Sequence, residues 1–268
     1  MVRTLIVGCF LGIAIGACAR EPRASAPEAR PSAASVGAGF TPPGEDGYGR
    51  AGEIVYLEQI IGDAKPSDTL PMLVLIHGRG DEPAHDWLPV TPSTPVRVIM
   101  PRAPLDFGTG YSWFPNRALT ATGPGGAELA RALSERADQI AAAVAILKRE
   151  RPTRGLPIAG GFSQGGMLSF ALAVRHPHAF RAILPIAGLL PESMFMSAAP
   201  AAPLPDVLAL HGDGDTLVPI DGARNAVRHL DQVGYDVEFL EYPGVPHTIT
   251  PSMLQAIGKW LDRQLERS

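Results

Sequence analysis

The sequence predicts an α/β fold, with a mostly parallel central sheet and helices on both of its faces. Short continuous apolar runs recur along the chain, as at 72–76, and such runs are typical of parallel strands that are buried on both faces. Segments with apolar residues at three- or four-residue spacing alternate with them, the longest at 127–149. This alternation of strand and helix is the pattern of one doubly covered sheet.

The elements follow one another without an internal repeat or a second domain. Strands are expected at 54–60, 72–76, 96–100, 156–162, 182–187, 207–210 and 237–242. Helices are expected at 127–149, 167–173, 222–233 and 251–265. Pro101 is expected to end the third strand, and the Gly-rich stretch 104–126 and the stretch 188–205 are expected to be loops.

Composition excludes several functional classes. The net charge of −4 gives no basic footprint for nucleic acid, so we expect no nucleic-acid partner. The two cysteines, Cys9 and Cys18, both lie at the N-terminus, so the folded part has no disulfide framework and no cysteine metal site. Neither a metal nor a cofactor is implied.

The first 17 residues resemble a secretory signal peptide, with Arg3 followed by an apolar run that is too short for a comfortable membrane span. The run ends at Gly16-Ala17-Cys18, which is similar to a bacterial lipobox. This resemblance implies export and a lipid anchor on Cys18, at the outer membrane because no Asp follows the cysteine. The alternative is an ordinary signal peptide in which Cys18 is incidental.

Residues 18–45 are rich in Ala, Pro, Arg, Ser and Gly and have almost no large apolar residue. Such a segment cannot bury enough surface to fold, so we expect a flexible linker. The folded domain is then expected to span 46–268.

The stretch Gly161–Gly165 has the pattern Gly-x-Ser-x-Gly, with Ser163 at its centre. An apolar run precedes it and a helical pattern follows it, which predicts a sharp strand-to-helix turn that points the serine hydroxyl out of the sheet. The N-terminus of the following helix favours developing negative charge at the same place. Ser163 is therefore the candidate nucleophile.

A serine hydroxyl needs a general base, and the chain offers seven histidines. We expect His247 to be the base, because it lies between the last predicted strand and the last helix, at the sheet edge where ligands bind. The alternative is a solvent-exposed loop histidine. His77 and His211 each come directly after a strand and are expected to be structural.

The base must be oriented by a carboxylate, and two candidates follow the strand at 207–210. Asp215 is favoured over Asp213, because the extra loop length lets it reach back toward His247. Spacing alone leaves both open, and Asp213 is suited to capping the turn with its side chain.

An acyl-transfer site also needs two backbone N–H groups to bind the oxyanion of the tetrahedral intermediate. One is expected from Gln164, the residue after the nucleophile. The other is expected from Arg79, in the loop after the strand at 72–76, through its backbone N–H and not through its charge.

Four sequence blocks occur in one order, and together they resemble a known family. They are LIHGRGD at 75–81, GFSQGG at 161–166, HGDGDTLVP at 211–219 and GVPH at 244–247. The resemblance is to the phospholipase/carboxylesterase family of α/β-hydrolases, which includes acyl-protein thioesterases, and it extends from about residue 53 to the C-terminus.

The resemblance implies an α/β-hydrolase fold. It also implies that Ser163 is the nucleophile, Asp215 the acid and His247 the base, with Arg79 and Gln164 at the oxyanion. It thereby favours Asp215 where spacing left two carboxylates open.

Large apolar residues in two predicted loops allow two interpretations. Tyr111, Trp113 and Phe114, together with Met194 and its neighbours Phe195 and Met196, could wall a pocket for an acyl or aromatic group. They could equally pack their loops against the core, because pockets and loop anchors use the same residue types.

The sequence thus predicts an exported, lipid-anchored serine carboxylesterase that acts on a small-molecule or lipid ester through an acyl-enzyme. Acyl-thioesterase, lysophospholipase or peptidase activity on the same machinery remains an alternative. A non-catalytic envelope lipoprotein that kept the fold for binding is a further alternative.

Overall fold

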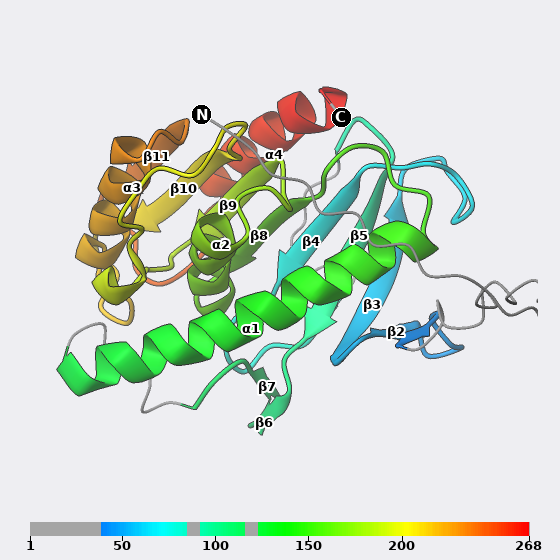
Figure 1. Ribbon diagram of the computed structural model, residues 1–268, viewed down its shortest axis with the longest axis horizontal. Coiled ribbons are helices and arrows are strands. Elements are labelled where there is room, and N and C mark those ends of the chain that lie inside the picture. The colour runs from blue at the N-terminus through cyan, green and yellow to red at the C-terminus, as the bar shows by residue number, and fades with distance from the viewer. Residues whose placement is uncertain (1–38, 85–91, 116–122, 268) are drawn as a thin grey trace, which may run out of the picture. The chain divides into compact units, whose positions relative to one another are not determined.

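A computed structural model describes residues 39–84, 92–115 and 123–267 (Figure 1). The predicted signal peptide and Cys18 lie outside the described residues, and so does most of the predicted linker. Within the described part of the chain, no helix is both long enough and apolar enough to cross a membrane.

Nine strands of the described chain form one sheet, in the order β1-β2-β3-β5-β4-β8-β9-β10-β11. Their bounds are β1 Phe40–Thr41, β2 Tyr48–Ala51, β3 Ile54–Ile61, β4 Met72–Ile76, β5 Val96–Arg102, β8 Ile158–Phe162, β9 Ala182–Ile186, β10 Asp206–Gly212 and β11 Val237–Tyr242. The strands from β5 to β11 in this order run parallel, whereas β1, β2 and β3 add an antiparallel edge. The prediction of a mostly parallel sheet is confirmed.

Helices cover both faces of the sheet, as predicted (Figure 1). They are α1 Gly123–Glu150, α2 Gln164–Arg175, α3 Asp221–Gln232 and α4 Pro251–Glu266. The first three share one core cluster with Met72, Val74 and Ile76 of β4. Helix α4 packs on the opposite face, against Leu73 and Leu75 of the same strand. Because successive side chains of a strand point to opposite faces, the five apolar residues of β4 serve both layers.

Strand β5 continues through Pro101, so the prediction that this proline ends the strand is wrong. Pro101 lies opposite Tyr56 of β3, whereas the pairing of β5 with β4 stops at Ile99. Beyond Ile99 no described strand pairs with that side of β5, and a residue without an N–H is tolerated there.

The Gly-rich stretch expected to be a loop contains a short hairpin. Its strands are β6 Leu105–Phe107 and β7 Gly110–Ser112, joined through Gly108, which has a φ of +62°. The loop after β9 likewise contains one short helical turn, η2 Glu192–Met194. Elements of two or three residues carry too little periodicity to be recognised in a sequence.

The folded domain begins earlier than predicted. Phe40 and Thr41, placed in the flexible linker, form β1 and pair with Ala51 and Arg50 of β2. The Arg151 guanidinium lies 5.0 Å from the centre of the Phe40 ring, which packs against the core. Phe40 is the first aromatic residue within the predicted linker, and its packing against the core explains the earlier start.

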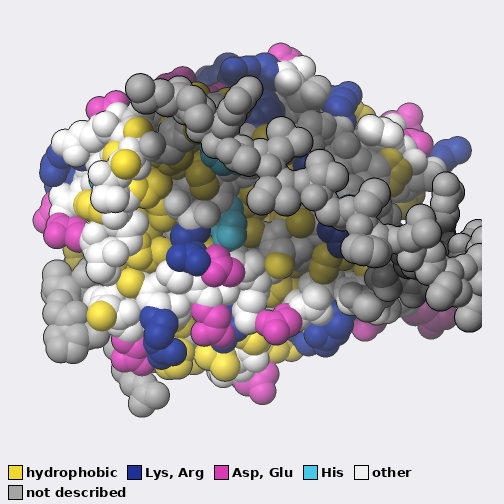
Figure 2. Space-filling view, viewed as in Figure 1, with side chains coloured by type: hydrophobic (Ala, Val, Ile, Leu, Met, Phe, Trp, Pro, Cys, Tyr) yellow, Lys and Arg dark blue, Asp and Glu magenta, His cyan; other side chains and the backbone are white. Residues whose placement is uncertain are grey.

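Charged side chains of both signs are interspersed on the face shown in Figure 2. Lys and Arg side chains alternate there with Asp and Glu side chains, and apolar side chains lie between them. Among the described residues visible on this face, no continuous surface of one charge is seen.

Candidate active site

Ser163 lies at the turn between β8 and α2, as the Gly-x-Ser-x-Gly pattern predicts. Its backbone has φ +58° and ψ −115°, a conformation that non-glycine residues rarely adopt. A Cβ on Gly165 would lie 1.9 Å from the carbonyl oxygen of Ile76, so only glycine lets this turn approach β4. The strained residue is held at the carboxyl edge of the sheet with its hydroxyl exposed to a cleft.

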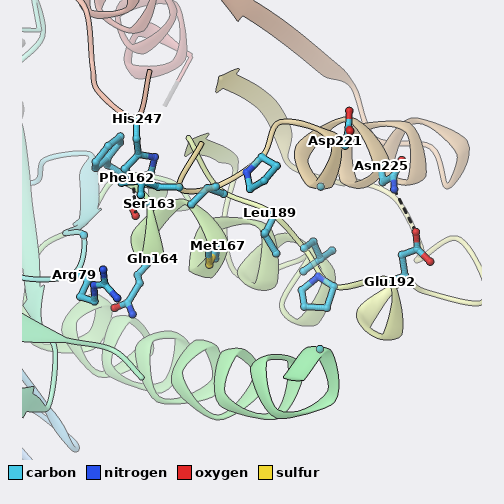
Figure 3. A pocket seen from close by; sticks show the side chains of 18 of the residues that line it. Arg79, Phe162, Ser163, Gln164, Met167, Leu189, Glu192, Asp221, Asn225 and His247 are labelled. Atoms are coloured by element: carbon cyan, nitrogen blue, oxygen red, sulfur yellow. Dashed lines mark hydrogen bonds between the residues drawn. The ribbon is translucent and has the colours of Figure 1, made fainter. Parts of the chain in front are cut away.

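Three residues from distant parts of the chain form one row of hydrogen bonds. The Oγ of Ser163 lies 2.9 Å from Nε2 of His247, and Nδ1 of His247 lies 2.6 Å from Oδ2 of Asp215. His247 stands over the serine, and its ring lies 4.7 Å, centre to centre, from the Phe162 ring (Figure 3). A hydroxyl, an imidazole and a carboxylate in this order can pass the serine proton to the imidazole.

The Asp215 carboxylate is buried and its second oxygen is also bonded. Oδ1 accepts the backbone N–H groups of Leu217 and Val218, at 2.9 Å and 2.8 Å. These bonds fix the carboxylate and leave Oδ2 for the imidazole. Asp213 instead accepts the N–H of Gly244 at 2.5 Å, and so caps the loop that leads to His247. The structure therefore gives the two carboxylates different roles: Asp215 bonds His247, and Asp213 bonds the backbone of Gly244.

His211 lies behind the carboxylate, in β10. Its Nε2 is 2.8 Å from the carbonyl oxygen of Val218 and 3.4 Å from Oδ2 of Asp215. Two oxygens facing Nε2 require the hydrogen to be on that nitrogen. Burial lowers the pKa of His211, which favours the neutral form of the ring. His211 is a structural neighbour of the row, as predicted.

His77 comes directly after β4 and is buried at the start of the loop that carries Arg79. Nε2 accepts the N–H of Ala103 at 3.1 Å, and Nδ1 donates to the carbonyl oxygen of Gly78 at 2.7 Å. Burial lowers the pKa of His77 as well. The ring supports the loop that carries Arg79 and does not contact the Ser163 hydroxyl in any described hydrogen bond.

The two predicted oxyanion donors lie on the same cleft as Ser163. Gln164 is the first residue of α2, where backbone N–H groups have no partner within the helix. Arg79 lies in the loop after β4, across from Gln164 (Figure 3). The Arg79 guanidinium lies 5.0 Å from the centre of the Phe107 ring of the β6–β7 hairpin.

A cleft of about 1060 Å³ extends from Ser163 and His247. Apolar residues form much of its wall: Phe162, Met167, Leu189, Leu190, Pro191, Leu217, Val218 and Pro219. Its far end is polar, where Glu192 accepts a hydrogen bond of 3.2 Å from Asn225 (Figure 3). A cleft of this size can hold a small ester or an acyl chain.

The predicted pocket residues do not line this cleft, and that prediction is wrong. Trp113 and Phe114 are buried in the core, and Tyr111 packs against the core with the Arg102 guanidinium 4.9 Å from its ring centre. Met194 lines a neighbouring, smaller hollow.

Phe195 and Met196 are not among the residues that line the cleft either. Phe195 stacks on His229 of α3, with ring centres 4.3 Å apart, and the N–H of Met196 donates to His229 Nε2 at 2.9 Å. These residues fasten their loops, which was the alternative interpretation.

Sequence reasoning missed the apolar wall that the structure shows. Leu189 and Leu190 follow the end of β9 by three and four residues, at the carboxyl edge where ligands bind, so their position was a usable signal. Leu217 stands two residues after Asp215 and is 73% exposed. Within the described residues, no group of three His, Cys, Asp or Glu side chains is placed to hold a metal ion.

A strained serine, a histidine and a buried carboxylate at the carboxyl edge of a mostly parallel sheet define the α/β-hydrolase fold class. The match to known proteins narrows this class. The Phospholipase/Carboxylesterase family model matches residues 58–265, and the chain belongs to that family.

Individual relatives resemble the chain over different lengths. A probable carboxylesterase of Oryza sativa subsp. japonica is 30% identical over 110 residues, which cover 40% of this chain and 41% of that protein. Acyl-protein thioesterase 1 of Mycosarcoma maydis is 28% identical over 230 residues, which cover 74% of this chain and 92% of that protein. The crystal structure of esterase PE8 superposes with a TM-score of 0.61 at 25% identity, over 77% of this chain and 97% of that one. The chain spans about two fifths of the length of the first of these curated relatives.

Proposed function

We propose that this protein is a serine carboxylesterase that hydrolyses carboxylic esters through an acyl-enzyme intermediate. The observation that carries the proposal is the continuous row of hydrogen bonds from Ser163 through His247 to Asp215. The strained backbone at Ser163 and the cleft beside it support the same assignment. A binding protein without catalysis would have no need for either feature at this position.

Acylation follows from the geometry. Ser163 Oγ attacks the ester carbonyl carbon while its proton passes to His247 Nε2, and the carbonyl oxygen becomes an oxyanion. The backbone N–H groups of Arg79 and Gln164 bind that oxyanion. The intermediate then collapses, the carbon–oxygen bond to the alcohol breaks, and the alcohol leaves with the proton from His247.

Deacylation repeats these steps with water in place of the serine. His247 takes a proton from a water molecule, whose oxygen attacks the acyl carbon. A second oxyanion forms and is bound by the same two N–H groups. Collapse breaks the bond to Ser163 Oγ, which regains its proton, and the carboxylic acid leaves. Asp215 holds the His247 ring in orientation and stabilises its cationic form in both halves.

Acyl-thioester hydrolysis is the second candidate. It is favoured by the similarity to acyl-protein thioesterase 1 of Mycosarcoma maydis over 92% of that protein. The apolar wall of the cleft supports a substrate with an acyl chain in either case. Turnover of p-nitrophenyl esters of graded chain length, measured beside acyl-thioesters, distinguishes the two activities by their ratio of kcat/KM.

A fluorophosphonate probe tests the nucleophile directly. We expect the probe to label the wild-type protein on Ser163 and to leave Ser163→Ala unlabelled. Ester turnover should fall by about 10⁴-fold or more in that variant, because the residual rate then comes from binding and the oxyanion donors alone. Unlabelled wild-type protein, or an alanine variant that retains wild-type turnover, would refute the proposal.

We also propose that the protein is exported and anchored by a lipid on Cys18, facing the periplasm or the exterior at the outer membrane. The apolar run before Gly16-Ala17-Cys18 supports this location. Replacing Cys18 with Ser should move the protein from the membrane fraction to the soluble one. A protein that stays in the membrane fraction after that change would contradict the anchor.

A further inference from the structure

The two oxyanion donors come from segments far apart in the chain. Arg79 follows β4 and Gln164 begins α2, so the distance between their N–H groups depends on how these two segments are held together. The segment Gly110–Phe114 contacts both sides and is almost entirely buried, with Trp113 fully inaccessible to solvent. We call this segment the strut.

On the Arg79 side, the strut is bonded to the residues that flank Arg79. The indole Nε1 of Trp113 donates to the carbonyl oxygen of His77 at 3.0 Å. The N–H of Gly80 donates to the carbonyl oxygen of Tyr111 at 2.8 Å, and the Tyr111 N–H donates to Asp81 at 2.9 Å. Arg79 is thus held from both directions along the chain.

The contact with this loop is too close for any residue but glycine at position 110. A Cβ on Gly110 would lie 2.3 Å from the carbonyl oxygen of Gly80. The strut therefore touches the oxyanion loop backbone to backbone, which leaves little room for the loop to move toward it.

On the Gln164 side, the strut binds the buried side-chain amide. Gln164 Oε1 accepts the backbone N–H of Trp113 at 2.9 Å, and Nε2 lies 3.4 Å from the carbonyl oxygen of Phe114. The Ser112 hydroxyl lies 3.2 Å from the amide and donates to Phe114 at 2.8 Å. A buried amide is costly to leave unpaired, so these bonds hold the first residue of α2 firmly.

We propose that Trp113, through the strut, is a positioning residue that sets the spacing of the Arg79 and Gln164 N–H groups for the oxyanion. This rests on the proposed esterase function. Its indole bonds one donor segment and its backbone N–H bonds the other, so a single residue joins both. Oxyanion stabilisation requires donors that are fixed before the reaction, and small displacements are costly.

Two substitutions each remove contacts of the strut, one on the Arg79 side and the other on the Gln164 side. Trp113→Phe keeps an aromatic ring and removes the donor to His77. Gln164→Met keeps the backbone N–H that binds the oxyanion and removes the amide that binds the strut. Tyr235→Phe is the matched control, because it removes a buried hydroxyl that donates to Ala173 at 2.8 Å and lies outside the cleft lining.

A trifluoromethyl ketone reports on the oxyanion site separately from ground-state binding. Ser163 Oγ adds to its carbonyl carbon, the proton passes to His247, and the carbonyl oxygen becomes a stable oxyanion. For each strut variant we expect kcat to fall by about tenfold with KM near the wild-type value, and the ketone to bind about tenfold more weakly. The loss of kcat in the double variant should be smaller than the product of the two single losses, because both substitutions alter the same distance between the Arg79 and Gln164 N–H groups. Tyr235→Phe should lower Tm and leave kcat and ketone affinity unchanged.

Two results would overturn the inference while leaving the esterase intact. In one, the strut variants lose Tm but keep kcat and ketone affinity, which is the behaviour of the control. In the other, KM rises and kcat is kept, which is the behaviour of a residue that only contacts substrate. Ser112→Ala, the mildest change, takes the same measurements if either larger variant fails to fold. Failure of the proposed function is distinct, because the wild-type protein would then neither turn over ester nor label with fluorophosphonate.

Discussion

Asp215 and Leu217 are two residues apart on the same loop, yet their surroundings are opposite. The Asp215 side chain is fully buried and bonded at both oxygens, whereas Leu217 is an apolar residue that is 73% exposed to solvent. The first arrangement holds a charge in place before any substrate arrives. The second leaves apolar surface uncovered, which a substrate in the cleft can bury. The same loop therefore carries a fixed carboxylate at Asp215 and, two residues later, exposed apolar surface at Leu217.

The largest effect expected within this comparison comes from the buried residue, Asp215. Asp215→Asn keeps the shape of the side chain but removes the charge that orients and stabilises His247. We expect kcat for a p-nitrophenyl ester to fall by about 10³- to 10⁴-fold. Asp213→Asn is the control, because Asp213 only caps the loop at Gly244. Equal losses in the two variants would contradict the assignment of Asp215.

A second prediction contrasts Leu217 with an apolar residue of the core. Phe114→Ala should lower the free energy of unfolding by about 3–5 kcal/mol, because the ring is fully buried and its removal leaves a cavity. Urea denaturation monitored by circular dichroism measures this loss. A change below about 1 kcal/mol would mean that the ring is not part of the packed core.

The exposed leucine should behave in the opposite way. Leu217→Ser should change the free energy of unfolding by no more than about 0.5 kcal/mol. We expect its KM for a long-chain ester to rise by about three- to tenfold, with little change for an acetyl ester, because only the long chain reaches the apolar wall. Steady-state kinetics with both esters measures the contrast. An equal rise for both esters would show that Leu217 does not contact the chain.

The smallest effect is a pH dependence of stability from the buried histidines behind the site. Burial lowers the pKa of His211 and His77, so the unfolded chain takes up protons at a pH where the folded protein does not. Stability is then complete above the ordinary histidine pKa of about 6.5 and decreases as the pH falls below it. Urea unfolding at pH 8, 7, 6 and 5 should show this slope.

The control for this prediction is His211→Gln, which keeps a side-chain N–H and removes the titration. Its slope below neutrality should be shallower than that of the wild-type protein. An equal slope would assign the pH dependence to other groups.

Chain order and residue chemistry were sufficient to predict the parallel part of the sheet, its covering helices, and Ser163 and His247. They left Asp213 and Asp215 both open, and the family resemblance favoured Asp215. Long apolar periods are strong signals, and few residues can serve as nucleophile, base and acid at strand ends. The short strands β1, β2, β6 and β7 were missed, because two to four residues carry too little periodicity to be recognised. Strand β5 continues past Pro101, because no described strand pairs with one side of it there, which is a property of the sheet and not of the local sequence.

The sequence by itself determined the class of fold and the chemistry of the site, since a strained serine turn, a late histidine and a paired carboxylate have few alternative uses. Only the tertiary structure decided which apolar residues face the cleft and which face the core. Trp113 and Phe114 are as suited to one place as to the other, because apolar burial has no direction. In the folded chain both side chains are buried. The indole N–H of Trp113 donates to the carbonyl oxygen of His77, and its backbone N–H donates to the Gln164 side chain.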